Sequence, residues 1–324
     1  MKILALHLRS YVEFAHIRGI NGSTILTNMH TPPADINDPQ AMVTSADFYY
    51  ALEAMHRLFQ DPELGLRVGN FMNLNALGLI YQISLQTTTI EEAIFYLKDF
   101  LSSTFPLIKM EQHSEADSHV LQLSISNDKT MLNRIILECL QVIILRELRM
   151  MGDRHLSIEA SSPHFNSSYP TGFTHGNTYR VSFSNLNLKA SIKRNELAQL
   201  GYLIPAYLKF IEGLKAEKDF QSKVKIAALN LAQPALPGLQ EIAEVFHLTP
   251  RTMQRMLAKE QLTFRKLSDN LNKQLGIILL RHDAYSITDV AYFLGYAEPA
   301  SFVHAFKKWY GSSPTSIRAE VFKQ

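Results

Sequence analysis

The sequence has almost no cysteine. Cys139 is the one cysteine among its 324 residues. A single cysteine excludes an internal disulfide and any metal site built from several cysteines. Because Cys139 lies in an apolar stretch, we predict an inert, packed thiol rather than a redox sensor. The twelve histidines are scattered without the paired spacing of metal ligands, so we predict no metal site.

Long uncharged apolar runs are also missing. Spanning a bilayer takes roughly 18 such residues, and the most apolar stretch, Met131–Met151, is interrupted by charge and predicts a buried helix. The interrupting residues are Arg134, Glu138, Arg146 and Glu147. After Lys2 the apolar stretch is too short for a signal peptide. We therefore expect a cytoplasmic protein with no membrane partner.

The motifs of several enzyme classes are absent as well. The chain contains no Walker loop, no G-x-G-x-x-G, no H-E-x-x-H and no G-x-S-x-G. We therefore predict no enzymatic activity, no catalytic residue and no cofactor, and we assign no cofactor-binding residue. The composition, with 46% apolar and 19% charged residues, is that of an ordinary globular protein and does not by itself indicate a function.

A short pattern occurs twice in the last hundred residues. The first copy is LQEIAEVFHLTPRTMQRML (239–257) and the second is ITDVAYFLGYAEPASFVHAF (287–306). Ala243 matches Ala291 and His247 matches Gly295, and in both copies a proline stands where the second helix begins. Each copy predicts a helix, a tight turn and a second helix. The sequence thus predicts two helix-turn-helix motifs, at 239–259 and 287–309, which suit two successive windows of the major groove of DNA.

The turn of each motif needs a residue that tolerates positive φ. Glycine does so most cheaply, which suits Gly295, and His247 belongs to the residues that are also found there. Thr249 is expected to cap the next helix, with Pro250 in its first turn.

The second helix of each motif has an inner and an outer face. In the first motif Met253, Met256 and Leu257 are expected to point into the core. The outer face carries Arg251, Thr252, Gln254, Arg255 and Lys259. Arginine can read guanine and glutamine can read adenine in the major groove, so we predict DNA contacts from the first four of these residues. In the second motif the outward residues are Ala300, Ser301, Val303, His304, Lys307 and Lys308. We expect the first motif to carry most base specificity, and the two lysines to contact phosphate.

The residues between the motifs and the distribution of charge support this prediction. Thr263–Leu280 reads as an amphipathic helix, about 27 Å long at 1.5 Å per residue. Such a rod could hold the motifs roughly one DNA turn apart. From residue 213 onward there are 15 basic and 10 acidic residues, a net charge of +5, whereas residues 1–212 have a net charge of −3. The basic excess lies on the part expected to bind DNA.

The segment from Phe220 to Phe322 resembles the DNA-binding domain of AraC/XylS-type transcription regulators. The most specific part is DVAYFLGYAEPASFVHAFKKWYGSSPTSIR, from Asp289 to Arg318. In it Gly311 ends the second recognition helix and Pro314 begins the last helix. Core anchors are expected at Phe302, Phe306 and Trp309. The resemblance implies seven helices, double-stranded promoter DNA and RNA polymerase as partners, activation of transcription, and base contacts at positions 251, 254, 255, 300, 301 and 304.

The first 212 residues show a different pattern. Helices are predicted at Asp47–Phe59 (capped by Asp47 or Ser45), from Asp61–Pro62 to Val68, at Leu77–Leu85 and at Ile90–Leu101 (capped by Thr88 or Thr89). Alternation predicts strands near 107–112, 119–125, 156–160 and 179–183, the first two as a hairpin. Residues 161–178 read as a loop. The fold class is therefore an α+β N-terminal domain followed by an all-α C-terminal domain with two helix-turn-helix motifs.

This half also resembles a known domain. The segment Pro62–Leu97 is similar to the arabinose-binding-type N-terminal effector domain of one AraC-family branch. The resemblance implies an effector-sensing and dimerisation domain at 1–212 and a DNA-binding domain at 213–324. The class of the effector stays open, and so does homodimer formation. Aromatic residues at Phe48, Tyr49, Tyr50 and Phe59 could line a pocket or pack in a core, so no ligand residue is assigned.

Our leading hypothesis is a transcription regulator, an activator whose N-terminal domain binds a small-molecule effector. Effector binding would shift the population of DNA-binding states through the helix near Asn195–Glu217. Two alternatives stay open. One is an enzyme that its C-terminal domain recruits to DNA, although the repair methyltransferases of this type need several cysteines. The other is a helical interaction module that does not bind DNA.

Overall fold

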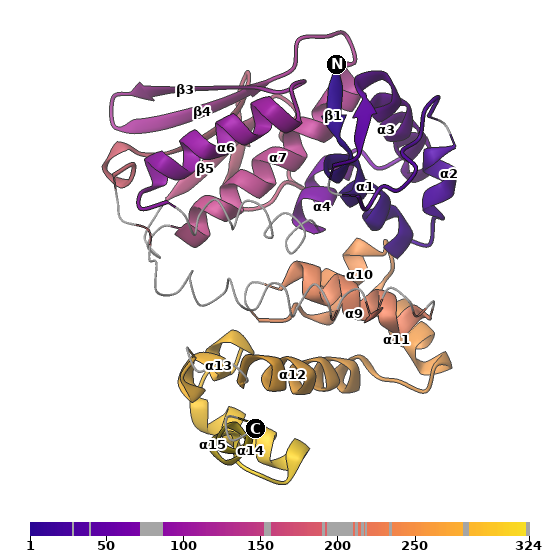
Figure 1. Cartoon of the computed structure of the whole chain (residues 1–324), viewed down its shortest axis with the longest axis vertical. Coiled ribbons are helices and arrows are strands. Elements are labelled where there is room, and N and C mark those ends of the chain that lie inside the picture. Colours follow the sequence, from indigo (N-terminus) through magenta and orange to yellow (C-terminus); the bar gives the residue numbers. More distant parts are fainter. Residues whose placement is uncertain are drawn as a thin grey trace. The chain divides into compact units, whose positions relative to one another are not determined.

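The chain forms two compact units, Met1–Arg194 and Asn195–Gln324 (Figure 1). The computed structural model describes residues 1–27, 29–38, 40–71, 87–151, 157–189, 192, 210, 213–214, 217, 219–232, 235–280 and 285–321. The predicted helix at 77–85 and most of the predicted helix at 195–217 lie outside these residues. The domain limits 1–212 and 213–324 remain a prediction.

The first unit begins with helices around a small antiparallel sheet. Its strands are β1 (Lys2–Leu4) and β2 (Met42–Thr44), and its helices are α1 (Ala5–Ile17), α2 (Gly22–Leu26), α3 (Ser45–Phe59) and α4 (Leu64–Phe71). Phe14, Phe48 and Phe71 are fully buried among them. Because β1 and β2 have three residues each, neither shows an alternating pattern in the sequence, and neither was predicted.

The start of α3 differs from the prediction. Its N-cap is Thr44, neither Asp47 nor Ser45, because the Thr44 hydroxyl accepts a hydrogen bond from the Asp47 backbone N–H at 3.0 Å. The Asp47 carboxylate is used elsewhere: it accepts from the His30 backbone N–H at 2.6 Å and from the Thr31 hydroxyl at 3.0 Å. Burial acts to raise the pKa of Asp47, but these hydrogen bonds, together with one that Asp47 accepts from the Thr44 hydroxyl at 2.8 Å, lower it overall. Asp47 therefore ties the segment before β2 to α3.

A five-stranded sheet follows, in the order β3-β4-β7-β5-β6. The strands are β3 (Lys109–Glu115), β4 (Ser118–Ser124), β5 (Ile158–Ser162), β6 (Phe173–His175) and β7 (Tyr179–Ser184), all antiparallel except for the β5–β6 pair. The predicted hairpin is β3–β4. The predicted loop at 161–178 is wrong at both ends, because residues 161–162 continue β5 and residues 173–175 form β6 at the sheet edge.

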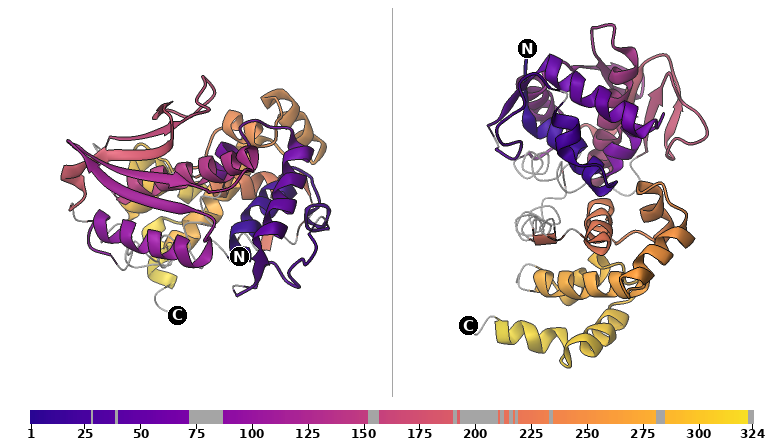
Figure 2. Two further views of the ribbon diagram at one scale, coloured as in Figure 1. Left: turned by 90° about the horizontal axis from the view of Figure 1, so that it is seen from above. Right: turned by 90° about the vertical axis from the view of Figure 1, so that its right-hand side faces the viewer.

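Two helices complete this unit. Helix α6 (Ile90–Thr104) begins at the Thr89 cap, as predicted, and α7 (Thr130–Met151) packs against β5 and β7 (Figures 1 and 2). Helix α4 approaches α7 so closely that a Cβ at Gly65 would lie 2.5 Å from the Ile135 carbonyl oxygen, and one at Gly69 would lie 2.7 Å from that of Cys139. Glycine at both positions is required by this contact.

The predicted burial of α7 and of its cysteine is confirmed. The helix is buried over most of its length, and the Cys139 thiol is buried within it. Burial raises the pKa of this thiol to about 12. Within the described ranges, no helix combines the length and the apolar character needed to cross a membrane.

The second unit is all-α, as predicted. The part of it that the structure describes contains seven helices: α9 (Phe220–Leu231), α10 (Leu239–Val245), α11 (Pro250–Lys259), α12 (Phe264–Leu280), α13 (Ile287–Phe293), α14 (Pro299–Tyr310) and α15 (Pro314–Val321). The predicted amphipathic helix between the motifs is α12. It buries Leu267, Leu271, Leu275 and Leu279 and packs directly against both helices of the second motif, α13 and α14. It also packs against α9, which in turn contacts α10 and α11 of the first motif.

Candidate nucleic-acid interface

The two predicted motifs begin with the same local structure. At the start of α10 the Gly238 N–H donates to the Glu241 carboxylate at 2.7 Å, and at the start of α13 the Ser286 N–H donates to the Asp289 carboxylate at 2.8 Å. In each copy the acid stands three residues after the cap, where it satisfies a backbone donor that the helix leaves free. The repeat thus extends to the helix caps.

The turns of the two motifs also match, as predicted. His247 has φ 52° and Gly295 has φ 81°, both in the left-handed region. The Leu248 N–H donates to the Ala243 carbonyl at 2.9 Å, and the Tyr296 N–H donates to the Ala291 carbonyl at 3.0 Å. This is the hydrogen bond that closes a helix through a left-handed residue. The same turn therefore sets the direction of both second helices.

The second helices start and end where the sequence predicted. The Thr249 hydroxyl caps α11 by accepting from the Thr252 N–H at 3.2 Å, and Pro250 follows in the first turn. Helix α14 has Pro299 in its first turn but no side-chain cap. It ends at Gly311, with φ 74°, and α15 starts at Pro314.

The inner faces of α11 and α14 form the core of the motifs. Met253 and Leu257 of α11 and Phe302 and Phe306 of α14 are fully buried. Two predicted core residues, Met256 and Trp309, are half-buried. The Trp309 ring lies at the margin of the core, with its centroid 6.3 Å from that of Phe306.

The outer faces present the predicted DNA-contacting side chains. On α11 the exposed residues are Arg251, Gln254, Arg255 and Lys259, and on α14 they are Ala300, Ser301, His304, Lys307 and Lys308. Thr252 differs, since it is half-buried and its hydroxyl lies 3.0 Å from that of Thr249. Its side chain supports the helix cap and is less available to a base than its neighbours.

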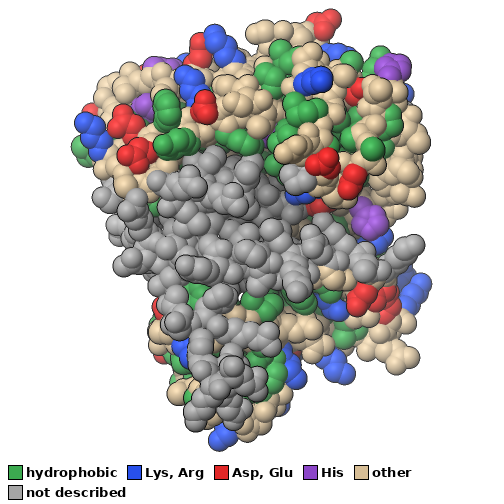
Figure 3. All heavy atoms as spheres, in the orientation of Figure 1, with side chains coloured by type: hydrophobic (Ala, Val, Ile, Leu, Met, Phe, Trp, Pro, Cys, Tyr) green, Lys and Arg blue, Asp and Glu red, His purple; other side chains and the backbone are tan. Residues whose placement is uncertain are grey.

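The cations on these faces are available to a partner. Within the described part of the chain, no ion pair engages Arg251, Arg255, Lys307 or Lys308. Lysine and arginine side chains are visible on the lower part of the molecule in Figure 3. Exposed cations without internal partners are the groups that contact DNA phosphates and base edges.

The described residues contain no group of three or more His, Cys, Asp or Glu side chains that could hold a metal ion. One buried polar cluster, around Glu138 of α7, was not assigned any role by the sequence. The sequence signal for it was the interruption of an apolar helix by charged residues, which predicted a buried helix but did not identify the partners of these charges.

Comparisons with known proteins find matches in both the N-terminal and the C-terminal half of the chain. A helix-turn-helix domain model matches residues 242–320, and the model of the arabinose-binding domain of AraC transcription regulators, N-terminal, matches residues 19–173. The chain is 22% identical over 322 residues to an uncharacterized HTH-type transcriptional regulator of Mycobacterium tuberculosis, covering 95% of this chain and 93% of the relative.

Two further similarities come from Pseudomonas aeruginosa. The HTH-type transcriptional regulator VqsM is 38% identical over 82 residues, covering 25% of each chain. The crystal structure of the transcriptional regulator CdpR is 20% identical, with a TM-score of 0.41, and covers 97% of this chain and 98% of the other.

Proposed function

We propose that this chain, which belongs to the AraC family of DNA-binding transcriptional regulators and has an arabinose-binding-type N-terminal domain, activates transcription from a short asymmetric promoter element. In this proposal a small molecule bound by residues 1–212 controls the activation. The observation that carries the DNA-reading part of the proposal is the exposed set of Arg251, Gln254 and Arg255 on α11, the second helix of its motif. Arginine and glutamine at this place suit bidentate contacts with guanine and adenine.

In this proposal the two motifs contribute unequally to DNA recognition. Helix α14 has the same scaffold as α11 but offers Ala300, Ser301 and His304 near its start. Alanine cannot donate or accept a hydrogen bond, and serine reads bases with little discrimination. We assign most base reading to α11, and to α14 a looser reading with phosphate contacts from Lys307 and Lys308.

In this proposal the N-terminal domain, residues 1–212, supplies control rather than DNA contact. The net charge of −3 over residues 1–212 makes this half a poor partner for a phosphate backbone. The matching N-terminal family model supports a ligand-sensing role. A ligand that favours the DNA-binding state of the chain would shift its population by the difference in affinity for the two states. RNA polymerase and a second copy of the chain complete the proposed set of partners.

Selection of binding sites tests the DNA-reading part. The purified full chain is incubated with a library of random duplexes at about 0.15 M salt, and the enriched pool is sequenced. We expect one asymmetric element, bound roughly 10³-fold or more tightly than a scrambled duplex. A pool that does not converge, or equal affinity for both duplexes, would remove the proposal. Binding to neither duplex at low salt would favour the interaction module without DNA binding.

Control and activation need a second assay. A promoter carrying the selected element drives a reporter in transcription with RNA polymerase, with and without the chain. Transcription should rise when the chain is added. A fall would show repression and would contradict the activating role while leaving DNA reading intact.

A further inference from the structure

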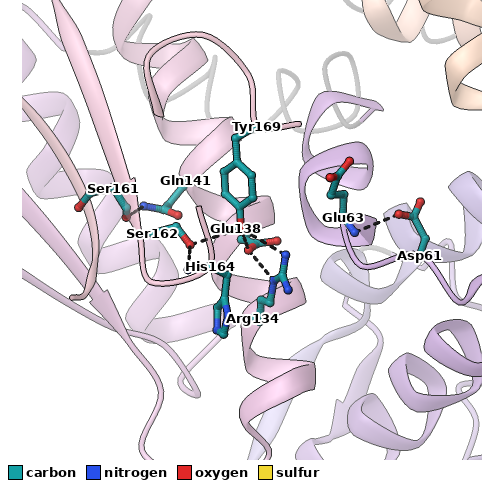
Figure 4. Close-up of polar contacts among 9 residues, drawn as sticks. All are labelled: Asp61, Glu63, Arg134, Glu138, Gln141, Ser161, Ser162, His164 and Tyr169. Atoms are coloured by element: carbon teal, nitrogen blue, oxygen red, sulfur yellow. Dashed lines mark hydrogen bonds and ion pairs between the residues drawn. The ribbon is translucent and has the colours of Figure 1, made fainter. Parts of the chain in front are cut away.

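A buried polar cluster lies in the first unit, between α7 and the strands packed against it. Glu138 and Gln141 of α7 have no exposed surface. Figure 4 shows Tyr169, from the loop between β5 and β6, pointing toward Glu138, with Arg134 one helical turn away. Burying a carboxylate and an amide in a helix that is otherwise apolar is costly unless every polar atom finds a partner.

One oxygen of Glu138 is well satisfied. Its Oε1 accepts from Arg134 Nε at 2.7 Å and from the Tyr169 hydroxyl. The other oxygen, Oε2, is buried and has no hydrogen-bond partner in the described part of the chain. Oε1 therefore fixes the position of the carboxylate, while Oε2 can still accept a hydrogen bond.

The side chain of Gln141 likewise has one polar atom that is hydrogen-bonded and one that is not. Its Nε2 donates to the carbonyl oxygens of Ser161 at 2.8 Å and Arg180 at 2.9 Å, which fixes the amide between β5 and β7. Its Oε1 is buried, again without a partner among the described residues. Because Glu138 and Gln141 are three residues apart on α7, they lie on the same face of the helix. Two open acceptors thus occur on one buried face.

The side chains around Glu138 include a second carboxylate, Glu63, and a cation, Arg134. Burial raises the pKa of Glu138, the nearby charge of Glu63 raises it further, and Arg134 and the Tyr169 hydroxyl lower it. Tyr179 is also close enough for the charge of Glu138 to raise its pKa, although burial is the larger cause. In the part of the chain that the structure describes, Arg134 is the one cation that forms an ion pair with Glu138.

We propose that Glu138 Oε2 and Gln141 Oε1 receive the primary ammonium group of a small amine. An ammonium group has three donors and no acceptor, which matches open sites that are all acceptors. A hydroxyl would bring lone pairs of its own, whereas Arg134 Nε and Gln141 Nε2 already donate within the cluster. A carboxylate or phosphate would place further negative charge beside Glu138. The site names the effector class of the proposed function and rests on it.

Calorimetry of the full chain without DNA tests the site. The probe is n-butylammonium chloride, and the matched probes are 1-butanol and sodium butyrate, which share its carbon chain. We expect binding of butylammonium alone, and at least a tenfold loss of affinity in Glu138→Gln. The matched control is Glu159→Gln, the same change at an exposed position of β5, which should bind like the wild type. Equal binding of the three probes, or unchanged affinity in a folded Glu138→Gln, would overturn the proposal.

A measurement on the wild type keeps the test independent of the folding of any variant. In nuclear Overhauser spectra, the methylene protons next to the nitrogen of butylammonium should show contacts with the ring protons of Tyr169. Contacts confined to other residues, or none at saturating probe, would overturn the site. If the amine fails to bind while the site selection yields a DNA element, this inference is wrong and DNA reading stands. Amine binding without DNA preference would remove the DNA-reading role instead.

Discussion

His247 and Gly295 have the same left-handed backbone conformation at equivalent points of two helix-turn-helix motifs, yet they differ in the space around them. A histidine side chain fits at the first turn. At the second, a Cβ on Gly295 would lie 2.7 Å from the Cβ of Ala235. The two motifs share a scaffold, and the second one has the turn that tolerates no side chain.

Replacing Gly295 by alanine should destabilise the fold more than replacing another left-handed glycine. Both φ and the contact with Ala235 oppose the new Cβ, so we expect a loss of about 2–3 kcal/mol in the free energy of unfolding in urea. The control is Gly311→Ala, where φ is 74° but no atom lies within 4 Å, with an expected loss of about 1–2 kcal/mol. Equal losses in the two variants would show that Ala235 gives way without cost.

Arg255→Ala should weaken sequence discrimination. Arg255 is exposed on α11 and has no ion-pair partner in the described residues, so its loss should reduce the free-energy gap between the selected and scrambled duplexes by about 1–3 kcal/mol. Fluorescence anisotropy with both duplexes measures this gap. Lys308→Ala is the matched change on α14 and should weaken binding to both duplexes alike, with a salt slope smaller by about 1. An unchanged gap in Arg255→Ala would refute base reading by this residue.

The elements that the sequence predicted well are those whose cause is local. The αL turns at 247 and 295, the Thr249 cap and the Gly311 terminus each depend on residues within one or two turns of helix. The long helices α7 and α12 also follow from periodicity over many residues. In the candidate interface, the exposed set on α11 follows directly from the phase of that helix, with Met253 and Leu257 fixing its inner face.

The elements that the sequence missed depend on distant partners. Strand β6 exists because residues 173–175 pair with residues 160–162, and three residues carry no alternation of their own. The Glu138 cluster joins α7 to Tyr169, which is 31 positions away along the chain. A charged residue in an apolar helix predicts that a partner must exist, but the fold decides which one it is.

Cys139 should be unreactive until the chain unfolds. Burial raises the pKa of its thiol to about 12, so at pH 8 the reactive thiolate is about a thousandfold scarcer than in an ordinary cysteine. Because the sequence has one cysteine, a colorimetric disulfide reagent should release one equivalent of chromophore in urea and almost none from the native protein over the same time. Rapid release of one equivalent from native protein would show that the helix around Cys139 opens readily.

Acid should destabilise the first unit through His7. The His7 ring stacks on Phe105 with centroids 4.6 Å apart, and its Nε2 lies 2.9 Å from the Thr104 hydroxyl. Burial lowers the pKa of His7 from 6.5 to about 4, so the folded state holds it neutral. The unfolded chain takes up the proton first, and the free energy of unfolding should fall by about 2–3 kcal/mol as the pH drops from 6.5 to 4. Urea titrations across this range measure how the free energy of unfolding changes with pH.

Two variants show whether His7 causes this change. His7→Phe keeps a ring against Phe105 and should make the free energy of unfolding depend less on pH. His175→Phe, an exposed control in β6, should leave the pH dependence as in the wild type. An equal slope in the wild type and His7→Phe would show that other groups cause the loss in acid.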